Sequence, residues 1–294
     1  MSLRIVIPAF NEAENLPQVL TEFKSFAIMH GFKIIIVNDG STDNTSQIIR
    51  KLTELDFIKI IEHRINKGYG NAIKSGICSA DTDYVITVDA DGQHCTEDIL
   101  NLYYTITSTG ADLVIGGRFN QKNASKIRGI GKSLIRYFVK LLIKVPVYDI
   151  NSGMKIYRTE LARKYVRLAP SGMAFSDVMT IIFVHFGDYV LEIPIKINKR
   201  LSGKSTINYK TGLSTIKEIL FIATVFAPYR FFSLLSSIIL LSALIWGLPF
   251  IFQGKGFTTA TAIGIMVSIL LWSLGIIAQL ISGIRKDLIL NSTQ

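Results

Sequence analysis

The chain has 294 residues, a formal net charge of +10 and a hydrophobic content of 49%. This length allows one sizeable domain with additional elements, and the apolar content alone does not establish a membrane protein. Residues 1–115 carry nine Lys or Arg against fifteen Asp or Glu, whereas residues 116–230 carry twenty against six. The acidic part suits a metal site, and the basic part suits phosphates and anionic lipid. We expect no nucleic-acid partner, because the basic part leads directly into long apolar segments.

The first part of the chain alternates apolar strands with amphipathic helices. The expected strands are Leu3–Ile7, Phe32–Val37, Ile58–Glu62, Tyr84–Val88 and Asp112–Ile115. The expected helices are Glu12–His30, Thr42–Leu55, Gly68–Ser79 and Thr96–Ser108. Nearly continuous apolar strands are typical of a sheet covered on both faces, so the pattern predicts an α/β fold with a parallel, doubly wound sheet. Ligands of such sheets bind beyond the carboxyl ends of the strands.

Two further loops at expected strand ends could contact a nucleotide. Asp39 is available to accept hydrogen bonds from a base or a ribose, because residues 41–43 can cap the next helix in its place. Lys67 and Gly68 bring a cation and a small residue to the start of a helix, which suits a phosphate. Either loop alone is also compatible with an ordinary turn.

Two carboxylates follow the strand expected at Tyr84–Val88. Asp89 and Asp91 are two residues apart, so in an extended chain they face the same side and can reach one divalent cation. Oxygen ligands of this kind suit Mg²⁺ or Mn²⁺ shared with substrate phosphates. Gln93 could add a carbonyl or a water-mediated contact. Although Asp-x-Asp is also common in solvated turns, its place at the end of a central strand favours a metal site.

Beyond Ile115 the periodicity becomes irregular. A helix expected at Ile130–Val145 carries a Lys or Arg every four residues, which fits either a membrane surface or an ordinary charged helix face. Another helix is expected at Thr211–Ala227 and should end before Pro228. In the apolar stretch Phe175–Phe186, Asp177 could orient an acceptor.

The last part of the chain contains two long apolar segments. Lys255, in a glycine-containing turn, is the only charged residue between Phe231 and Ile284. Segments 231–253 and 257–284 are each long enough to cross a bilayer, and the alternative is a hairpin buried in a large soluble core. The basic flanks place both termini in the cytoplasm by the positive-inside rule. These flanking residues are Lys210, Lys217, Arg230, Arg285 and Lys286. Since the first ten residues read as a strand and its turn, we expect no cleavable signal peptide.

Several ordered blocks resemble the family 2 glycosyltransferases. Within that family, the likeness is to the polyprenyl-phosphate glycosyltransferases, which include dolichyl-phosphate mannosyltransferases and bacterial undecaprenyl-phosphate glucosyltransferases. The blocks lie at residues 7–12, 37–43, 66–68, 89–93, 116–118, 149–153 and 200–205. Together they extend over about the whole chain, and their order and spacing are more specific than any one of them.

This resemblance implies a GT-A fold, which is Rossmann-like with a mostly parallel sheet, and it implies roles for individual residues. The implied donor-binding residues are Pro8, Phe10, Glu12, Asp39, Lys67, Gly68, Asp89, Ala90, Asp91, Arg200 and Lys204. The implied metal ligands are Asp89, Asp91 and Gln93, which would hold Mg²⁺ or Mn²⁺ on the diphosphate. The implied catalytic residues are Asp89, Asp91, Arg118 and Arg128.

Two of these assignments have alternatives. Arg118 and Arg128 would bind the acceptor phosphate, but they could instead be surface charges near lipid headgroups. The family often has Lys directly after the Ser of the last block, whereas this chain has Thr206 there and Lys204 before the Ser. The assignment of Lys204 to the donor phosphates is weaker for that reason.

The resemblance also implies a reaction and a domain organisation. The reaction would be inverting transfer of a hexose from UDP-glucose, UDP-N-acetylglucosamine or GDP-mannose to a polyprenyl phosphate, for glycan or cell-envelope assembly. The expected parts are a cytosolic catalytic domain at 1–208, a juxtamembrane amphipathic helix at 209–230, membrane-spanning helices at 231–253 and 257–284, and a cytosolic tail at 285–294. Membrane lipids are expected partners, and a homo-oligomer formed through the spans is a family-based expectation.

Rival functions differ in sequence features. A processive polysaccharide synthase usually carries a Gln-x-x-Arg-Trp motif, but the two tryptophans, Trp246 and Trp272, both lie in the expected spans. A nucleotidyltransferase would open with a glycine-rich, arginine-containing loop after the first strand, where this chain has residues 8–12. A membrane scaffold that binds nucleotide-sugars without turnover remains open, as does a glycosyltransferase with a different membrane acceptor.

Overall fold

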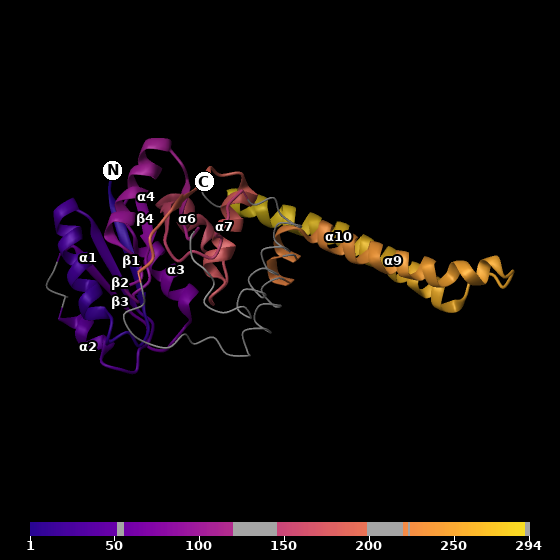
Figure 1. Cartoon of the computed structure of the whole chain (residues 1–294), viewed down its shortest axis with the longest axis horizontal. Coiled ribbons are helices and arrows are strands. Elements are labelled where there is room, and N and C mark those ends of the chain that lie inside the picture. Colours follow the sequence, from indigo (N-terminus) through magenta and orange to yellow (C-terminus); the bar gives the residue numbers. More distant parts are fainter. Residues whose placement is uncertain (52–55, 120–145, 199–219, 223, 292–294) are drawn as a thin grey trace. The chain divides into compact units, whose positions relative to one another are not determined.

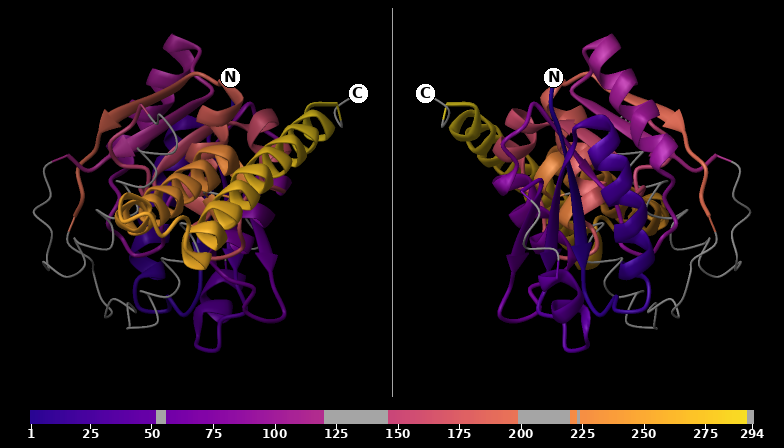
Figure 2. Two further views of the ribbon diagram at one scale, coloured as in Figure 1. Left: turned by 90° about the vertical axis from the view of Figure 1, so that its right-hand side faces the viewer. Right: turned by 90° about the vertical axis from the view of Figure 1, so that its left-hand side faces the viewer.

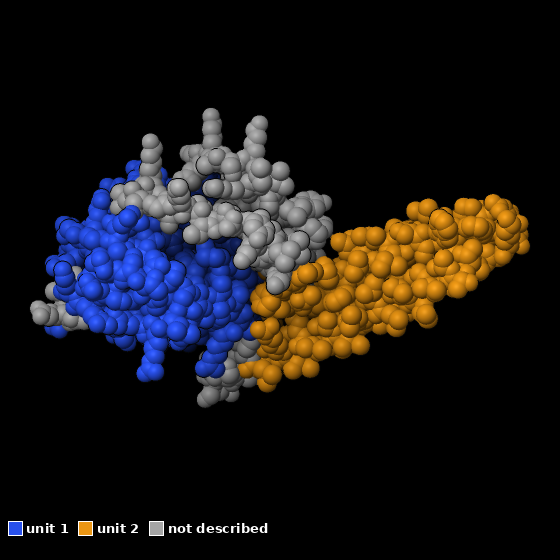
Figure 3. All heavy atoms as spheres, turned by 90° about the horizontal axis from the view of Figure 1, so that it is seen from below, with its two compact units in different colours: residues 1–123, 145–207 blue, residues 124–144, 208–294 orange. Residues whose placement is uncertain are grey.

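The computed structural model describes residues 1–51, 56–119, 146–198, 220–222 and 224–291. These residues belong to two compact units, one made of described residues up to 198 and the other of those from 220 onward (Figure 3). The expected helix at Ile130–Val145 and most of the one at Thr211–Ala227 lie outside the described residues. Residues 220–222 and 224–226 are helical, and the helix is interrupted at Ala227, directly before Pro228 as expected.

The first unit is built on a seven-stranded sheet (Figure 1). Its strands are β1 (Leu3–Ala9), β2 (Lys33–Asn38), β3 (Ile58–Glu62), β4 (Tyr84–Thr87), β5 (Leu113–Gly117), β6 (Lys155–Arg158) and β7 (Val190–Pro194). They lie in the order β3-β2-β1-β4-β6-β5-β7. Within this sheet only β6 runs antiparallel to its neighbours β4 and β5, so the predicted mostly parallel α/β sheet is confirmed.

Helices cover both faces of this sheet. They are α1 (Leu16–His30), α2 (Thr45–Arg50), α3 (Tyr69–Ser79), α4 (Thr96–Thr109), α6 (Thr159–Tyr165) and α7 (Phe175–Phe186). Apolar residues of α1 and α4 form one core with alternate residues of β1, β2 and β4. On the other face α3 packs against β1 and β2 and contacts α6 and α7. Every residue of β1 is buried, which explains why all of them except Arg4 are apolar.

The sequence missed the elements that follow β5. Strand β6 has only four residues and includes Lys155 and Arg158, so its composition does not resemble that of a buried strand. Strand β7 is a half-buried edge strand that contains Glu192 and Pro194. Among the predicted helices, α1 begins at Leu16 rather than at Glu12, and Pro17 lies in its first turn. The intervening residues form a turn at the carboxyl end of β1.

The second unit contains two long apolar helices, α9 (Pro228–Phe252) and α10 (Thr259–Asn291), which run side by side (Figures 1 and 2). Each is long and apolar enough to cross a membrane. Small residues let the helices approach closely, with Gly247 facing Thr261 and Gly264 facing Ala243. The connection between them contains Lys255, as the sequence predicts.

Substitution of two glycines distinguishes the cost of backbone strain from the cost of a steric clash. Gly40 and Gly110 have nearly the same left-handed φ, +69° and +70°. A Cβ at Gly110 would meet open space, whereas one at Gly40 would collide with the backbone of Ile65 and Asn66. Gly110→Ala should therefore lower the free energy of unfolding by about 1–2 kcal/mol. Gly40→Ala should lower it further, because the loop after β3 must move.

Thermal unfolding of the full chain in detergent compares the two variants. Equal melting temperatures for Gly40→Ala and Gly110→Ala would show that a Cβ at position 40 does not clash with the loop after β3.

Candidate active site

The carboxyl ends of β1, β2 and β4 meet at one edge of the sheet. Ala9 pairs with Asn38 across β1 and β2, and the Val88 amide continues the β4 ladder by donating to the carbonyl of Val6. The residues that follow these strands therefore lie at the same edge. This is the position that the sequence predicts for the nucleotide and metal residues.

Two loops at this edge are joined by hydrogen bonds. Asn11 has a left-handed φ of +54°, which its short polar side chain tolerates better than most residues. Its amide donates to Ser41 Oγ at 3.0 Å, and its side-chain oxygen accepts from the Thr42 amide at 2.8 Å. The Glu12 amide donates to Thr45 Oγ1 at 3.0 Å. The loops after β1 and β2 are thus held together by hydrogen bonds.

The predicted nucleotide residues on the first loop differ in exposure. Pro8 is buried within β1, whereas Phe10, just after the strand, is 43% exposed. Glu12 is half-buried, and its carboxylate accepts a hydrogen bond from Asn15 Nδ2 at 2.6 Å. Phe10 therefore offers the larger accessible surface, and the nucleotide-binding roles of all three stay predictions.

Asp39 is more constrained than the sequence suggests. Its Oδ1 accepts from His63 Nδ1 at 2.6 Å and from the Lys67 amide at 3.0 Å, and its Oδ2 accepts from the Gly68 amide at 2.8 Å. The other His63 nitrogen lies 2.9 Å from Ser75 Oγ. Because a carboxylate can accept about four hydrogen bonds, these three leave capacity for about one more from a ligand. The backbone amides of Lys67 and Gly68 are thus bonded to Asp39, and the phosphate contact expected of these two residues stays a prediction.

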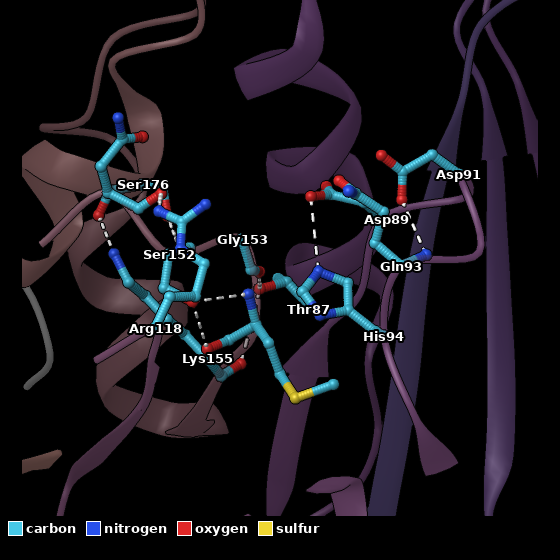
Figure 4. A network of polar contacts seen from close by, with 12 residues as sticks. Thr87, Asp89, Asp91, Gln93, His94, Arg118, Ser152, Gly153, Lys155 and Ser176 are labelled. Carbon is cyan, nitrogen blue, oxygen red and sulfur yellow. Dashed lines mark hydrogen bonds and ion pairs between the residues drawn. The ribbon is translucent and has the colours of Figure 1, made fainter. Parts of the chain in front are cut away.

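Asp89 follows β4 and has polar contacts with Tyr69 of α3 and with His94. Tyr69 donates its hydroxyl to Asp89 Oδ1 at 2.8 Å, and His94 Nε2 lies 3.6 Å from Oδ2 (Figure 4). Burial by itself raises the pKa of Asp89, but His94, Tyr69 and the charge of Arg118 together hold it below its ordinary value. The carboxylate is therefore ionised at neutral pH, and the 34% exposure of its side chain to solvent also favours the charged form.

Asp91 completes the predicted carboxylate pair, with the buried Ala90 between the two. Its side chain accepts a hydrogen bond from the Gln93 amide at 3.1 Å, and Gln93 itself is half-buried (Figure 4). Oxygen donors of this kind fit Mg²⁺ or Mn²⁺. Among the described residues no three His, Cys, Asp or Glu side chains are arranged to hold a metal. A cation here would need further oxygens, which Gln93 and a bound diphosphate can supply.

The segment after β7 is tied to this carboxylate loop. The Asn198 amide donates to the carbonyl of Gln93 at 2.9 Å. The chain toward Arg200 and Lys204 therefore starts beside the predicted metal residues. Arg200, Lys204 and Arg128 lie outside the described residues, so their predicted roles stay predictions.

Arg118 follows β5 and forms an ion pair that the sequence does not reveal. Its Nε and Nη2 bind the two oxygens of Asp149 at 2.6 and 3.0 Å, and Nη2 also donates to the carbonyl of Asn151 at 2.9 Å. Glu192 in turn accepts from the amides of Tyr148 and Asp149. Because its side chain is only 27% exposed and is paired, Arg118 does not resemble a free surface charge.

Lys155 holds the loop of Asp149 against α7. It is fully buried, and its Nζ donates to the carbonyls of Ile150 and Ser176 (Figure 4). Burial lowers the pKa of Lys155 to about 7, although Asp177 and Asp149 oppose that shift. Asp177, which the sequence suggested as an acceptor-orienting residue, is itself buried on α7.

Sequence reasoning therefore missed several residues around the predicted site. Asp149 and Gly153 belong to a block that the resemblance singled out, but no role was attached to them. Tyr69 and His94 directly follow predicted site residues, and this position in the sequence could have indicated that they lie near the site. Lys155 gave no signal, since a lysine is rarely buried without a partner.

Comparisons with known proteins show the family of this chain. Residues 4–166 match the model of glycosyl transferase family 2. The chain belongs to this family. Residues 227–284 match a second model, described as the GtrB C-terminal hairpin, which corresponds to α9 and α10. This family 2 glycosyltransferase thus joins a GT-A unit to a hairpin of two apolar helices.

Curated relatives of this glycosyltransferase cover most of its length. An uncharacterized protein of Methanocaldococcus jannaschii is 30% identical over 74% of this chain and 90% of its own. Polyprenol monophosphomannose synthase of Mycolicibacterium smegmatis is 29% identical over 74% of this chain and 83% of its own. Undecaprenyl-phosphate 4-deoxy-4-formamido-L-arabinose transferase of Proteus mirabilis is 28% identical over 80% and 71%.

Solved structures confirm the GT-A fold. Glucosyl-3-phosphoglycerate synthase of Mycobacterium tuberculosis, in complex with Mn²⁺, UDP-glucose and phosphoglyceric acid, superposes with a TM-score of 0.60 at 18% identity. The match covers 76% of this chain and 79% of that one. At this identity the likeness establishes the fold alone.

Gly153 offers a direct test of the Asp89 position. A Cβ at Gly153 would collide with Asp89 Oδ2, whereas one at Gly172 would meet open space. Gly153→Ala should displace the carboxylate and lower kcat/KM for sugar transfer by about 100-fold, the scale expected for a misplacement near 1 Å. The matched variant Gly172→Ala should keep wild-type activity. Equal activity of the two variants would mean that transfer does not depend on where Asp89 lies.

The Lys155 pKa predicts a pH dependence of stability. Folding lowers its pKa from 10.5 to about 7, so between these values the unfolded chain binds a proton that the folded chain does not. The free energy of unfolding should therefore rise with pH through this window. The neutral amine keeps two N–H donors for the two carbonyls that it contacts.

Unfolding in detergent at pH 7, 8 and 9 measures this slope. Lys155→Met should remove it, whereas Lys59→Met, at an exposed position on β3, should leave it intact. The same slope in both variants would contradict the assigned pKa.

Proposed function

We propose that this glycosyltransferase transfers a hexose from a nucleotide-sugar to a polyprenyl phosphate, with inversion at the anomeric carbon. The observation that carries the proposal is the GtrB-type hairpin that follows the family 2 unit. A hairpin long enough to cross a bilayer would keep the site beside a lipid substrate. Two relatives bear names that specify polyprenol or undecaprenyl phosphate.

The donor would bind along the edge formed by β1, β2 and β4. Phe10 and Asp39 would contact the nucleoside end, and Asp89, Asp91 and Gln93 would hold Mg²⁺ or Mn²⁺ at the diphosphate end. When bound, the cation would stabilise the negative charge that grows on the leaving diphosphate. In this proposal Arg200 and Lys204 would approach the same phosphates, because Asn198, shortly before them in the sequence, is hydrogen-bonded to Gln93.

Arg118 would bind and aim the acceptor phosphate. Its Nε and Nη2 donate hydrogen bonds to Asp149. Nη1 donates no hydrogen bond within the described part of the chain, so this nitrogen can donate to an anion. Asp149 and Asp89 raise the pKa of Arg118, although burial alone would lower it, so its charge persists. Arg128 would add a second contact from the neighbouring segment.

The reaction would need no general base. The second pKa of a phosphate monoester is about 6, so the acceptor is mostly a dianion at neutral pH. It would need orientation more than deprotonation, and an arginine fixed by Asp149 supplies that orientation. Attack of a phosphate oxygen on the anomeric carbon, with departure of the nucleoside diphosphate, would be a single inverting displacement.

We place the catalytic unit and both termini in the cytoplasm. The basic residues that flank the hairpin support this orientation. A homo-oligomer formed through the hairpin is a further, family-based part of the proposal. The donor remains one of UDP-glucose, UDP-N-acetylglucosamine and GDP-mannose, since sugar choice depends on pocket shape.

Sugar transfer to lipid can be measured directly. Membranes that contain the protein are incubated with polyprenyl phosphate, Mn²⁺ and each radiolabelled nucleotide-sugar in turn, and label is counted in the organic extract. We expect label from one donor, dependent on added lipid phosphate. Chelation of the metal should abolish transfer, and Mn²⁺ should restore it.

Substitution of Asp91 tests whether this residue binds the metal. Asp91→Asn should abolish transfer while the protein stays folded, because the site lies at a strand end, and Asp56→Asn, at an exposed position, should have no effect. Wild-type turnover by Asp91→Asn in Mn²⁺ would exclude the metal assignment. Nucleotide binding without organic-phase label from any donor would favour another membrane acceptor or a non-catalytic scaffold.

A further inference from the structure

Asp89 is restrained on both of its oxygens. The Tyr69 hydroxyl donates to Oδ1 at 2.8 Å, and Gly153 lies against Oδ2 without room for a Cβ. His94 Nε2 faces the same oxygen at 3.6 Å (Figure 4), which is beyond hydrogen-bond range. The Tyr69 hydroxyl therefore makes the shorter of these two polar side-chain contacts to the carboxylate.

Tyr69 is well placed to keep this contact. It is the first residue of α3, and the amides of Lys67 and Gly68 directly before it are fixed by Asp39. An ordinary tyrosine hydroxyl is protonated at physiological pH, so this one can donate to Asp89.

We propose that Tyr69 is a positioning residue for the metal site, whose hydroxyl fixes Asp89 in the orientation that receives the cation. This inference rests on the proposed metal role of Asp89. A carboxylate that is already oriented loses less rotational freedom when it binds. Hydrogen-bond partners of metal ligands typically change metal affinity by about 10–100-fold.

A purely structural role for Tyr69 makes a different prediction. A buried tyrosine usually finds a partner for its hydroxyl, and Asp89 could be no more than that partner. In that case, removal of the hydroxyl would affect stability but not the affinity for metal. Metal binding measured without turnover therefore separates the two roles.

The test compares Tyr69→Phe with Tyr103→Phe. Tyr103, on α4, also donates its hydroxyl, to the carbonyl of Met1 at 2.6 Å, so both variants lose one hydrogen bond. Mn²⁺ binding to the full-length protein in detergent is followed by electron paramagnetic resonance of free Mn²⁺, with UDP and then GDP present. The Kd for Mn²⁺ should rise about 10-fold in Tyr69→Phe and stay unchanged in Tyr103→Phe.

Two further measurements complete the test. Nucleotide binding without metal should be unchanged in Tyr69→Phe, and saturating Mn²⁺ should restore its kcat for transfer. A wild-type Kd for Mn²⁺ in Tyr69→Phe would overturn the inference, as would a wild-type protein that binds no Mn²⁺. Weaker Mn²⁺ binding in Tyr69→Phe, in a protein whose wild type labels no lipid phosphate, would support the positioning role and refute the proposed acceptor.

Discussion

Three consecutive residues connect two carboxylates of the predicted donor site. The amides of Lys67 and Gly68 bind Asp39, and the hydroxyl of Tyr69 binds Asp89. Asp39 follows β2 and Asp89 follows β4, with β1 between these strands. The start of α3 therefore spans three strands and fixes the separation of the two acids. The sheet brings the acids to one edge, and this short segment sets how they are spaced along it.

A second carboxylate network organises the opposite side of the site. Asp149 receives the Arg118 guanidinium and is itself held by Glu192 through its amide. Lys155, buried beneath it, ties the same loop to α7. Charges taken out of water are tolerated only when their hydrogen bonds are satisfied. Such a network favours one arrangement, so Arg118 would present a fixed face to an incoming anion.

The sequence predicted the fold through β5 because buried parallel strands leave an unmistakable apolar pattern. It failed at β6, where a charged residue, Lys155, is buried by contacts with carbonyls that no local pattern shows. It also placed Asp89 and Asp91 at the correct edge, since strand ends follow from strand order. It did not reveal the hydrogen bonds that Asp39 accepts from Lys67 and Gly68, because these partners are backbone amides. Backbone groups are present at every position, so the sequence does not show which of them will bind.

The same contrast bears on how this site can diverge. The contact from position 67 to Asp39 uses a main-chain N–H group, which almost any residue supplies. A change of the Lys67 side chain therefore leaves this hydrogen bond in place. The contact from Tyr69 to Asp89 depends on one side-chain hydroxyl, and a single codon change removes it. The hydrogen bond to Asp89 is therefore more sensitive to a side-chain change at position 69 than the hydrogen bonds to Asp39 are to one at position 67.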